Sequence, residues 1–347
     1  MKELLCNVVG NESLRNRLGL DVLQDKLPHA IIIEGARGSG RRTLAKTLAA
    51  SLVCERKGED GVALPCQDCL SCRKVFENKS PDVITIRREK DKATLGIEPI
   101  RFLKSDVYTV PNDSDRKVYV IDEADKMTQQ AQNALLLTLE EPPSYVHIIL
   151  ICENSSVLLE TIRSRAPIMR TERLSTEQID KYVSSVDRRA AQLKLSDPKR
   201  YAELLMASGG GIGPALEYLD TNAFEPVYQR REFAIALVRA MIKDGRASST
   251  IPLLTRFFKK GQREPATNHL LTVNDALRDL ILLKKSDSAS LCFFADRDEA
   301  IELSDCASIT FLFELQSAVR TAIDEISLRS ANIRLSLTKM MVSSKIL

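Results

Sequence analysis

Four cysteines in one short stretch have the spacing of a metal site. Cys66, Cys69 and Cys72 form a C-x2-C-x2-C pattern, and Cys54 precedes them by a polar loop. Four thiolates at this spacing can converge tetrahedrally on one zinc ion, and a site with four protein ligands leaves no position for water. We therefore predict a structural zinc site. An iron–sulfur cluster, which uses similar spacings, and a site without metal stay open as alternatives.

The chain has eight cysteines, and the other four are isolated in apolar or loop segments, where we expect them only to pack. No apolar run approaches the roughly eighteen residues of a membrane span, and the first residues are too interrupted for a signal peptide. These features predict a cytoplasmic protein with no membrane partner. Because thiols stay reduced in that compartment, a disulfide framework is not expected.

A second group of residues has the frame of a phosphate-binding loop. Gly35, Gly38 and Gly40 fit the pattern G-x-x-x-x-G-K-[ST] between an apolar run and a helical segment. The lysine position holds Arg41, which can still pair with phosphate oxygens. The hydroxyl position holds an arginine, and Thr43 comes one residue late, a turn of about 100° on a helix. Nucleotide binding stays open, but magnesium-dependent ATP hydrolysis is not expected.

Two acids could complete such a site. Asp122 and Glu123 directly follow the apolar run Lys117–Ile121, as a Walker B pair follows its strand. In that role the first acid orders the metal through water and the second polarises the attacking water. The alternative is a solvated acidic pair at the end of a strand. The loop and the acids together favour a phosphate site more than either does alone.

Alternating strand and helix segments must position these residues. Short β-branched apolar runs predict strands at 29–34, 117–121 and 146–152, and helical patterns follow at 43–53, 98–108 and 128–139. Buried strands that alternate with helices indicate a doubly wound parallel sheet. The predicted fold class of this part is therefore α/β.

The rest of the chain reads as helical. Short helices are expected at 174–186, 198–207 and 213–219, and longer amphipathic ones at 230–242, 274–285 and 309–328. With 347 residues, two or three domains are expected. The net charge of +3 decides nothing about nucleic acid, and the absence of Trp with 5% aromatic residues leaves no stacking platform for bases.

Several motifs resemble one family, the clamp-loader subunits of bacterial DNA polymerase III, of the AAA+ class. They are the inserted four-cysteine module, HAIIIEG, SPDVITI, TLGIEPIR, the DEAD stretch at 122–125, QNALLLTLEEPP at 132–143 and TIRSRAP at 161–167. The resemblance covers about the first 170 residues. It implies an AAA+ α/β module at 1–170 with a zinc module at 54–72, a helical lid domain at 171–222 and an all-α collar domain at 223–347.

The resemblance also implies a role for one arginine. Ser164, Arg165 and Ala166 stand where the family has a Ser-Arg-Cys motif, whose arginine enters the ATP site of the neighbouring subunit. Arg165 is thus expected to be an arginine finger in trans, the alternative being a surface arginine in a basic run. Two family features are absent: Gly213 stands where motor subunits have a sensor arginine, and Cys152-Glu153-Asn154 lacks their threonine-rich sensor.

These departures resemble the delta-prime type of subunit, which does not hydrolyse ATP. The implied partners are gamma/tau and delta subunits, the sliding clamp, and primed DNA contacted mainly through its backbone. The chain would then be an accessory subunit of a DNA polymerase holoenzyme without an activity of its own. Two alternatives stay open, an ATP-hydrolysing gamma/tau-type motor and a stand-alone zinc-containing nucleotide-binding regulator.

Overall fold

The chain forms two compact units in a computed structural model that describes residues 4–36, 38–89, 92–258, 262–286, 289, 291–327 and 331–343. The first unit runs to Tyr182 and includes Gly210–Ile212, and the second comprises Val183–Gly209 and the chain from Gly213 onward. Arg37, inside the phosphate loop, lies outside the described residues.

A five-stranded sheet in the order β2-β3-β4-β1-β5 forms the centre of the first unit, and all of its pairings are parallel. Its strands are β1 (Ala30–Glu34), β2 (Val83–Ile86), β3 (Lys117–Ile121), β4 (Val146–Cys152) and β5 (Ile168–Arg170). The parallel α/β class is thus confirmed, with three strands where the apolar runs predicted them. The four-residue β2 and the three-residue β5 were not expected, because they are short and only partly buried.

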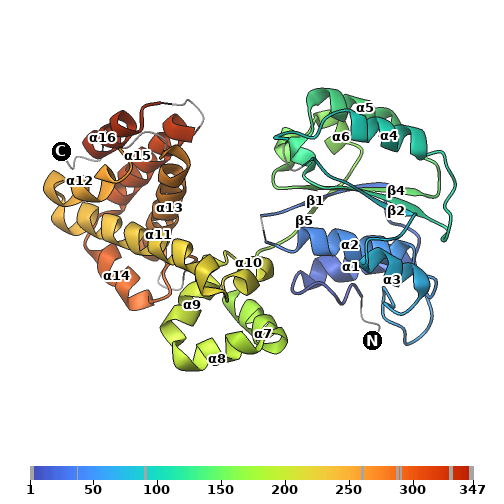
Figure 1. The fold of residues 1–347 in the computed structure, drawn as a ribbon, viewed down its shortest axis with the longest axis horizontal. Coiled ribbons are helices and arrows are strands. Elements are labelled where there is room, and N and C mark those ends of the chain that lie inside the picture. The colour runs from blue at the N-terminus through green and yellow to red at the C-terminus, as the bar shows by residue number, and fades with distance from the viewer. Residues whose placement is uncertain are drawn as a thin grey trace. The chain divides into compact units, whose positions relative to one another are not determined.

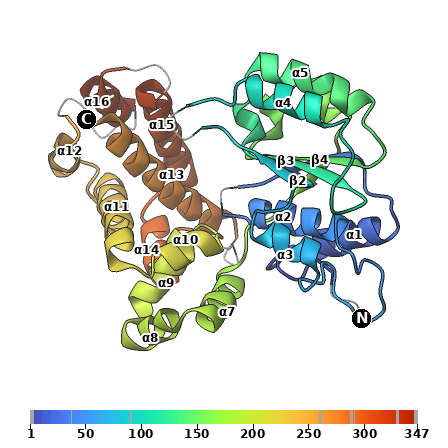
Figure 2. The ribbon, with the colours of Figure 1, turned by 45° about the vertical axis from the view of Figure 1, so that its right-hand side comes forward.

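Helices cover both faces of this sheet, as Figures 1 and 2 show. One face carries α4 (Glu98–Asp106), α5 (Gln129–Glu140) and α6 (Glu160–Arg163), and the other carries α1 (Glu12–Leu23), α2 (Arg41–Leu52) and α3 (Leu70–Phe76). Successive side chains of a strand point to opposite faces. Ile31 and Ile33 of β1 accordingly join the buried cluster around α1–α3, and Ala30 and Ile32 join the cluster around α4–α6.

The remaining elements are helical. α7 (Thr176–Val186) crosses the boundary between the units, and α10 (Ile212–Glu217) begins at the second boundary. The other helices are α8 (Arg188–Ser196), α9 (Pro198–Ala207), α11 (Thr221–Arg239), α12 (Ala247–Thr255), α13 (Arg263–Lys285), α14 (Arg297–Asp305), α15 (Ile309–Ser327) and α16 (Ile333–Ser343). Among the described residues, no helix is long and apolar enough to cross a membrane.

One aspartate anchors a loop inside the helical unit. Asp279 on α13 has no exposed surface. Its Oδ2 accepts the backbone N–H groups of Cys292, Phe293 and Phe294 at 2.7–3.2 Å. Such bonds compensate the cost of burying a carboxylate. They fix the connection to α14 against the cluster of apolar side chains that α11, α13 and α15 share.

Candidate functional sites

The four cysteines predicted to bind metal converge between α2 and α3. Cys54 follows α2, and Cys72 lies in the first turn of α3. All four Sγ atoms lie within 4.8 Å of one another, and those of Cys66 and Cys72 are 3.9 Å apart. A tetrahedron with metal–sulfur bonds of about 2.3 Å has edges of about 3.8 Å. The sulfurs are therefore spaced to hold one metal ion.

The electrostatics of the cluster also fit a cation. The backbone N–H groups of Cys69 and Cys72 donate to the Sγ atoms of Cys66 and Cys69, each at 3.4 Å. A hydrogen bond with Cys72 lowers the pKa of Cys54 to about 5, and the same contact, with burial, raises the pKa of Cys72. One thiolate thus opposes the ionisation of the next. A divalent cation would allow all four to be thiolates together.

The glycines of the phosphate loop adopt backbone that other residues rarely take. Gly38 has φ 87°, and Gly40, which precedes α2, has φ 83°. At Gly35 a Cβ atom would lie 2.0 Å from the Thr171 hydroxyl oxygen. The strand–loop–helix frame predicted from the sequence is therefore present.

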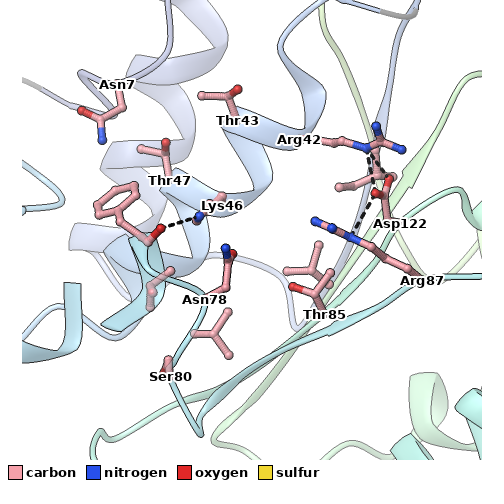
Figure 3. A pocket seen from close by; sticks show the side chains of 15 residues that line it. Asn7, Arg42, Thr43, Lys46, Thr47, Asn78, Ser80, Thr85, Arg87 and Asp122 are labelled. Atoms are coloured by element: carbon pink, nitrogen blue, oxygen red, sulfur yellow. Dashed lines mark hydrogen bonds and ion pairs between the residues drawn. The ribbon is translucent and has the colours of Figure 1, made fainter. Parts of the chain in front are cut away.

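Arg42, at the hydroxyl position of the motif, pairs directly with the first acid (Figure 3). Its Nε lies 3.0 Å from Oδ1 and 2.7 Å from Oδ2 of Asp122, whose side chain is only 5% exposed. Arg87 reaches Oδ2 at 3.5 Å, and the backbone N–H of Glu123 donates to Oδ1 at 3.0 Å. The bond to Asp122 raises the pKa of Arg42. Both carboxylate oxygens are thus engaged by the protein itself.

The other predicted site residues are paired as well. Glu123, held at φ 54°, lies 2.6 Å from Arg88 Nε. Arg41, at the lysine position, lies 3.1 Å from an oxygen of Glu153, directly after β4. Thr43 does not join the acids but lines a neighbouring cavity. The structure brings Arg42, the two acids and the loop frame together, but as an ion-pair network.

Sequence reasoning missed the partners in this network. Arg87 and Arg88 directly follow β2, and Glu153 directly follows β4. Because parallel strands end at the same edge of a sheet, these residues must lie beside Asp122, which follows β3. The run VITI before Arg87 was the available signal, had it been recognised as a strand.

The predicted arginine finger lies at the surface beyond α6. Arg165 Nη2 is 2.8 Å from Glu140 Oε1, and its side chain is 36% exposed. Its Nη1 donates to the carbonyl of Thr161 at 3.0 Å and to the hydroxyl of Ser164 at 3.3 Å. The next residue, Ala166, is buried and fixes the backbone. The guanidinium is thus accessible, and an ion pair holds it to the end of α5.

A cavity of about 690 Å³ adjoins the phosphate loop within the first unit. Figure 3 shows side chains from α2, the end of α3 and the strands β2 and β3 around it. It meets the predicted site at Arg42, Thr43 and Asp122, but the loop glycines and Arg41 do not line it.

Comparison with protein families places the first unit. Residues 10–175 match the family described as "DNA polymerase III, delta subunit". This segment, just under half of the chain, is therefore similar to that family.

Individual relatives agree with this placement. The tau subunit of DNA polymerase III from Bacillus subtilis is 32% identical over 62% of this chain and 37% of its own length. The tau subunit from Escherichia coli is 31% identical over 70% of this chain and 38% of its own. The delta' subunit from Yersinia pestis is 36% identical over 40% of this chain and 39% of its own. The chain thus spans less than half the length of each.

Among solved structures, a DNA polymerase III gamma subunit-related protein from Thermotoga maritima aligns with 94% of this chain and 98% of its own. Its TM-score is 0.44 and its sequence identity is 18%.

Proposed function

We propose that this chain is a clamp-loader subunit of DNA polymerase III of the delta-prime type. It would act in the cytoplasm and hydrolyse no ATP. It would supply Arg165 to the ATP site of a neighbouring motor subunit while the complex places the sliding clamp on primed DNA. The delta-subunit-like sequence of residues 10–175 and the relatives among tau and delta' subunits support the assembly.

The observation that carries the non-hydrolysing role is the pairing of Arg42 with Asp122. A hydrolysing site of this kind needs a hydroxyl and an aspartate free to hold magnesium and its water. Here a guanidinium replaces the hydroxyl and engages both oxygens of the aspartate. Arg41 is likewise paired with Glu153. The acids thus neutralise the chain's own arginines.

The position of Arg165 supports the role in trans. A finger must be accessible and must exchange its resting partner for a γ-phosphate. Arg165 is partly exposed, and its acidic partner Glu140 is itself 45% exposed, so the ion pair is screened by water and weak. Ser164 would orient the guanidinium through the contact that it already makes.

The remaining parts receive roles consistent with this assembly. Residues 54–72 would form a structural zinc module, 171–222 a lid domain and 223–347 a collar that binds the gamma/tau and delta subunits. DNA contacts would go to the phosphate backbone. At Gly213 a side chain would meet open space, so packing does not account for the absence of a sensor arginine there.

The test is ATP hydrolysis by the reconstituted complex, with its clamp and primed DNA. Arg165→Ala in this chain should lower the rate by about a thousandfold at the site that it serves, without loss of assembly. Arg163→Ala is the matched control, because Arg163 is an exposed arginine two residues away. Equal rates for the two variants would show that Arg165 is not the arginine finger.

A gamma/tau-type motor is the second candidate, favoured by the tau relatives and by the retained pair Asp122 and Glu123. The purified chain alone distinguishes the two. We expect no turnover of ATP with magnesium. Turnover that disappears in Glu123→Gln would establish a gamma/tau-type motor subunit and reject the non-hydrolysing delta-prime role.

A further inference from the structure

The cavity beside the phosphate loop carries positive charge that its own walls do not neutralise. Lys46 on α2 donates from Nζ to the carbonyl of Phe76 at 2.7 Å. Within the part of the chain that the structure describes, it has no carboxylate within ion-pair distance. Among the described residues, the one carboxylate that pairs with Arg87, on the β2 wall, is Asp122, which it shares with Arg42. Three cations thus line the cavity with one carboxylate.

The ammonium of Lys46 lies near another positive charge in this cavity. Burial and the neighbouring charge of Arg87 lower the pKa of Lys46. A lysine ammonium has three donors, and only one hydrogen bond of Lys46 is accounted for. An anion between Lys46 and Arg87 would relieve the repulsion and accept from both side chains.

The wall of the same cavity also contains a buried hydroxyl. Thr47, one of the lining residues, is fully buried, and its hydroxyl oxygen has no hydrogen-bond partner among the described residues. An unsatisfied buried hydroxyl is rare, because it loses water without compensation. Asn78 and Thr85 add polar groups on the facing wall (Figure 3).

Part of the lining is apolar. Val83, Val120 and Ile151, from β2, β3 and β4, form part of the wall. The volume of about 690 Å³ is within the usual range for small-molecule sites, which combine apolar walls with a few polar groups. The cavity can therefore hold an organic body as well as an anion.

We propose that this cavity binds a small organic phosphate, with its phosphate between Lys46 and Arg87 and its organic part against the aliphatic wall. The site goes beyond the proposed clamp-loader role. The proposed phosphate position between Lys46 and Arg87 differs from that of the phosphate loop, because the loop glycines and Arg41 do not line the cavity, although Arg42 and Thr43 do. Binding requires no magnesium, since both oxygens of Asp122 are already engaged.

Calorimetric titration of the purified full chain in EDTA tests the site, with inorganic pyrophosphate, AMP and adenosine as probes. AMP should bind more tightly than pyrophosphate, and adenosine should not bind. Lys46→Gln and Arg87→Gln should each weaken AMP binding about tenfold or more, since each removes a charge-assisted hydrogen bond. Arg101→Gln is the matched control and should change nothing, because Arg101 is exposed on α4 and does not line the cavity.

Three results would overturn the proposal. If neither phosphate compound binds at millimolar concentration, the cavity is not an anion site. If Arg41→Gln abolishes binding and Lys46→Gln does not, the ligand belongs to the phosphate loop. If pyrophosphate binds as tightly as AMP, the organic part makes no contact. None of these results depends on ATP hydrolysis in the complex. This proposal and the role of Arg165 can therefore fail independently of each other.

Thr47→Val separates a ligand contact from a fold contact. Valine has the same shape without the hydroxyl, so the melting temperature without ligand should stay the same or rise. The affinity for AMP should fall severalfold. A lower melting temperature with unchanged affinity would contradict the assignment.

Discussion

The two ends of α2 carry different candidate sites. At its C-terminal end, Cys54 joins three more thiols whose sulfurs are spaced to hold one metal ion. At its N-terminal end, the glycines keep the phosphate-loop frame, but arginines replace the residues that would hold phosphate and magnesium, and they pair with the nearby acids. The backbone frame of a site can therefore persist where its chemistry does not.

The difference lies in what each end lacks. The thiols oppose one another's ionisation, so that end becomes electrically satisfied only when a cation is added. Asp122 is already paired with Arg42 and Arg87 of the chain itself, so it needs no added cation. One end of the helix is thus built for a ligand, and the other has been closed by its own side chains.

The largest predicted effect is at the cysteine end. We expect one zinc ion per purified chain, and Cys72→Ser should lose it. Because Cys72 has no exposed surface and structural zinc stabilises folding directly, the free energy of unfolding should fall by about 3 kcal/mol or more. Elemental analysis and urea unfolding measure the two effects.

Cys306→Ser is the control for that experiment, because Cys306 is exposed and outside the cluster. It should retain the metal and the wild-type stability. If Cys72→Ser behaved like the control, or if iron replaced zinc in the purified protein, the zinc assignment would be wrong.

The next effect is at the phosphate-loop end. Arg42→Met keeps most of the side-chain length but leaves the buried carboxylate of Asp122 with the more distant Arg87 and the backbone N–H of Glu123. Removing one partner of a buried charge is costly, so we expect a loss of about 2 kcal/mol in urea unfolding. Arg101→Met, which breaks an exposed helical pair with Glu98, should cost little. Similar values for both variants would mean that Asp122 does not depend on Arg42.

A smaller effect should follow from restoring the motif. The double variant Arg41→Lys with Arg42→Thr gives the loop the lysine and hydroxyl that bind phosphate and magnesium. It also releases the oxygens of Asp122 that Arg42 engages. We expect magnesium to strengthen ATP binding about tenfold in the variant and not at all in the wild type. Equal magnesium dependence would show that these two positions did not close the site.

Much of this comparison was predictable from the sequence. The glycine pattern, the acids after 117–121 and the cysteine spacing are local signals, and each was found where its spacing placed it. The ion-pair network was not predictable in the same way, because Arg87 and Glu153 meet the loop only through strand order. A strand of four residues such as β2 gives too short a pattern to be recognised alone.

The helical part shows a related limit. The expected helix at 230–242 begins at Thr221, because Asp220 caps it by accepting from the N–H of Asn222. Pro226 lies within this extension, and the sequence therefore did not predict a helix there, since proline within a helix is unfavourable. The helix expected from 274 likewise begins at Arg263. In α13, Ala266, Leu270 and Val273 pack in the shared core, which extends this helix beyond its amphipathic pattern.

The smallest predicted effect is a pH-dependent contribution to stability at the phosphate-loop end of α2. Glu34 ends β1 directly before the phosphate loop, and it accepts the N–H and hydroxyl of Ser155 and pairs with Arg170. Burial alone would raise the pKa of Glu34, but these bonds together hold it below its usual value. A lowered folded-state pKa stabilises the fold above the unfolded value of about 4.3, and this stabilisation is lost as the pH falls through the folded pKa.

Glu34→Gln should therefore cost about 1 kcal/mol at pH 7, and this cost should shrink as the pH falls through the lowered folded-state pKa and the wild-type carboxyl becomes neutral. Urea unfolding at several pH values measures the difference, with the exposed Glu172→Gln as the control. The metal content at pH 7 should be unchanged in Glu34→Gln, because Glu34 precedes the N-terminal end of α2 and Cys54 follows its C-terminal end. A cost that stayed the same down to the lowest pH at which the protein folds would mean that the glutamate acts through its shape and not its charge.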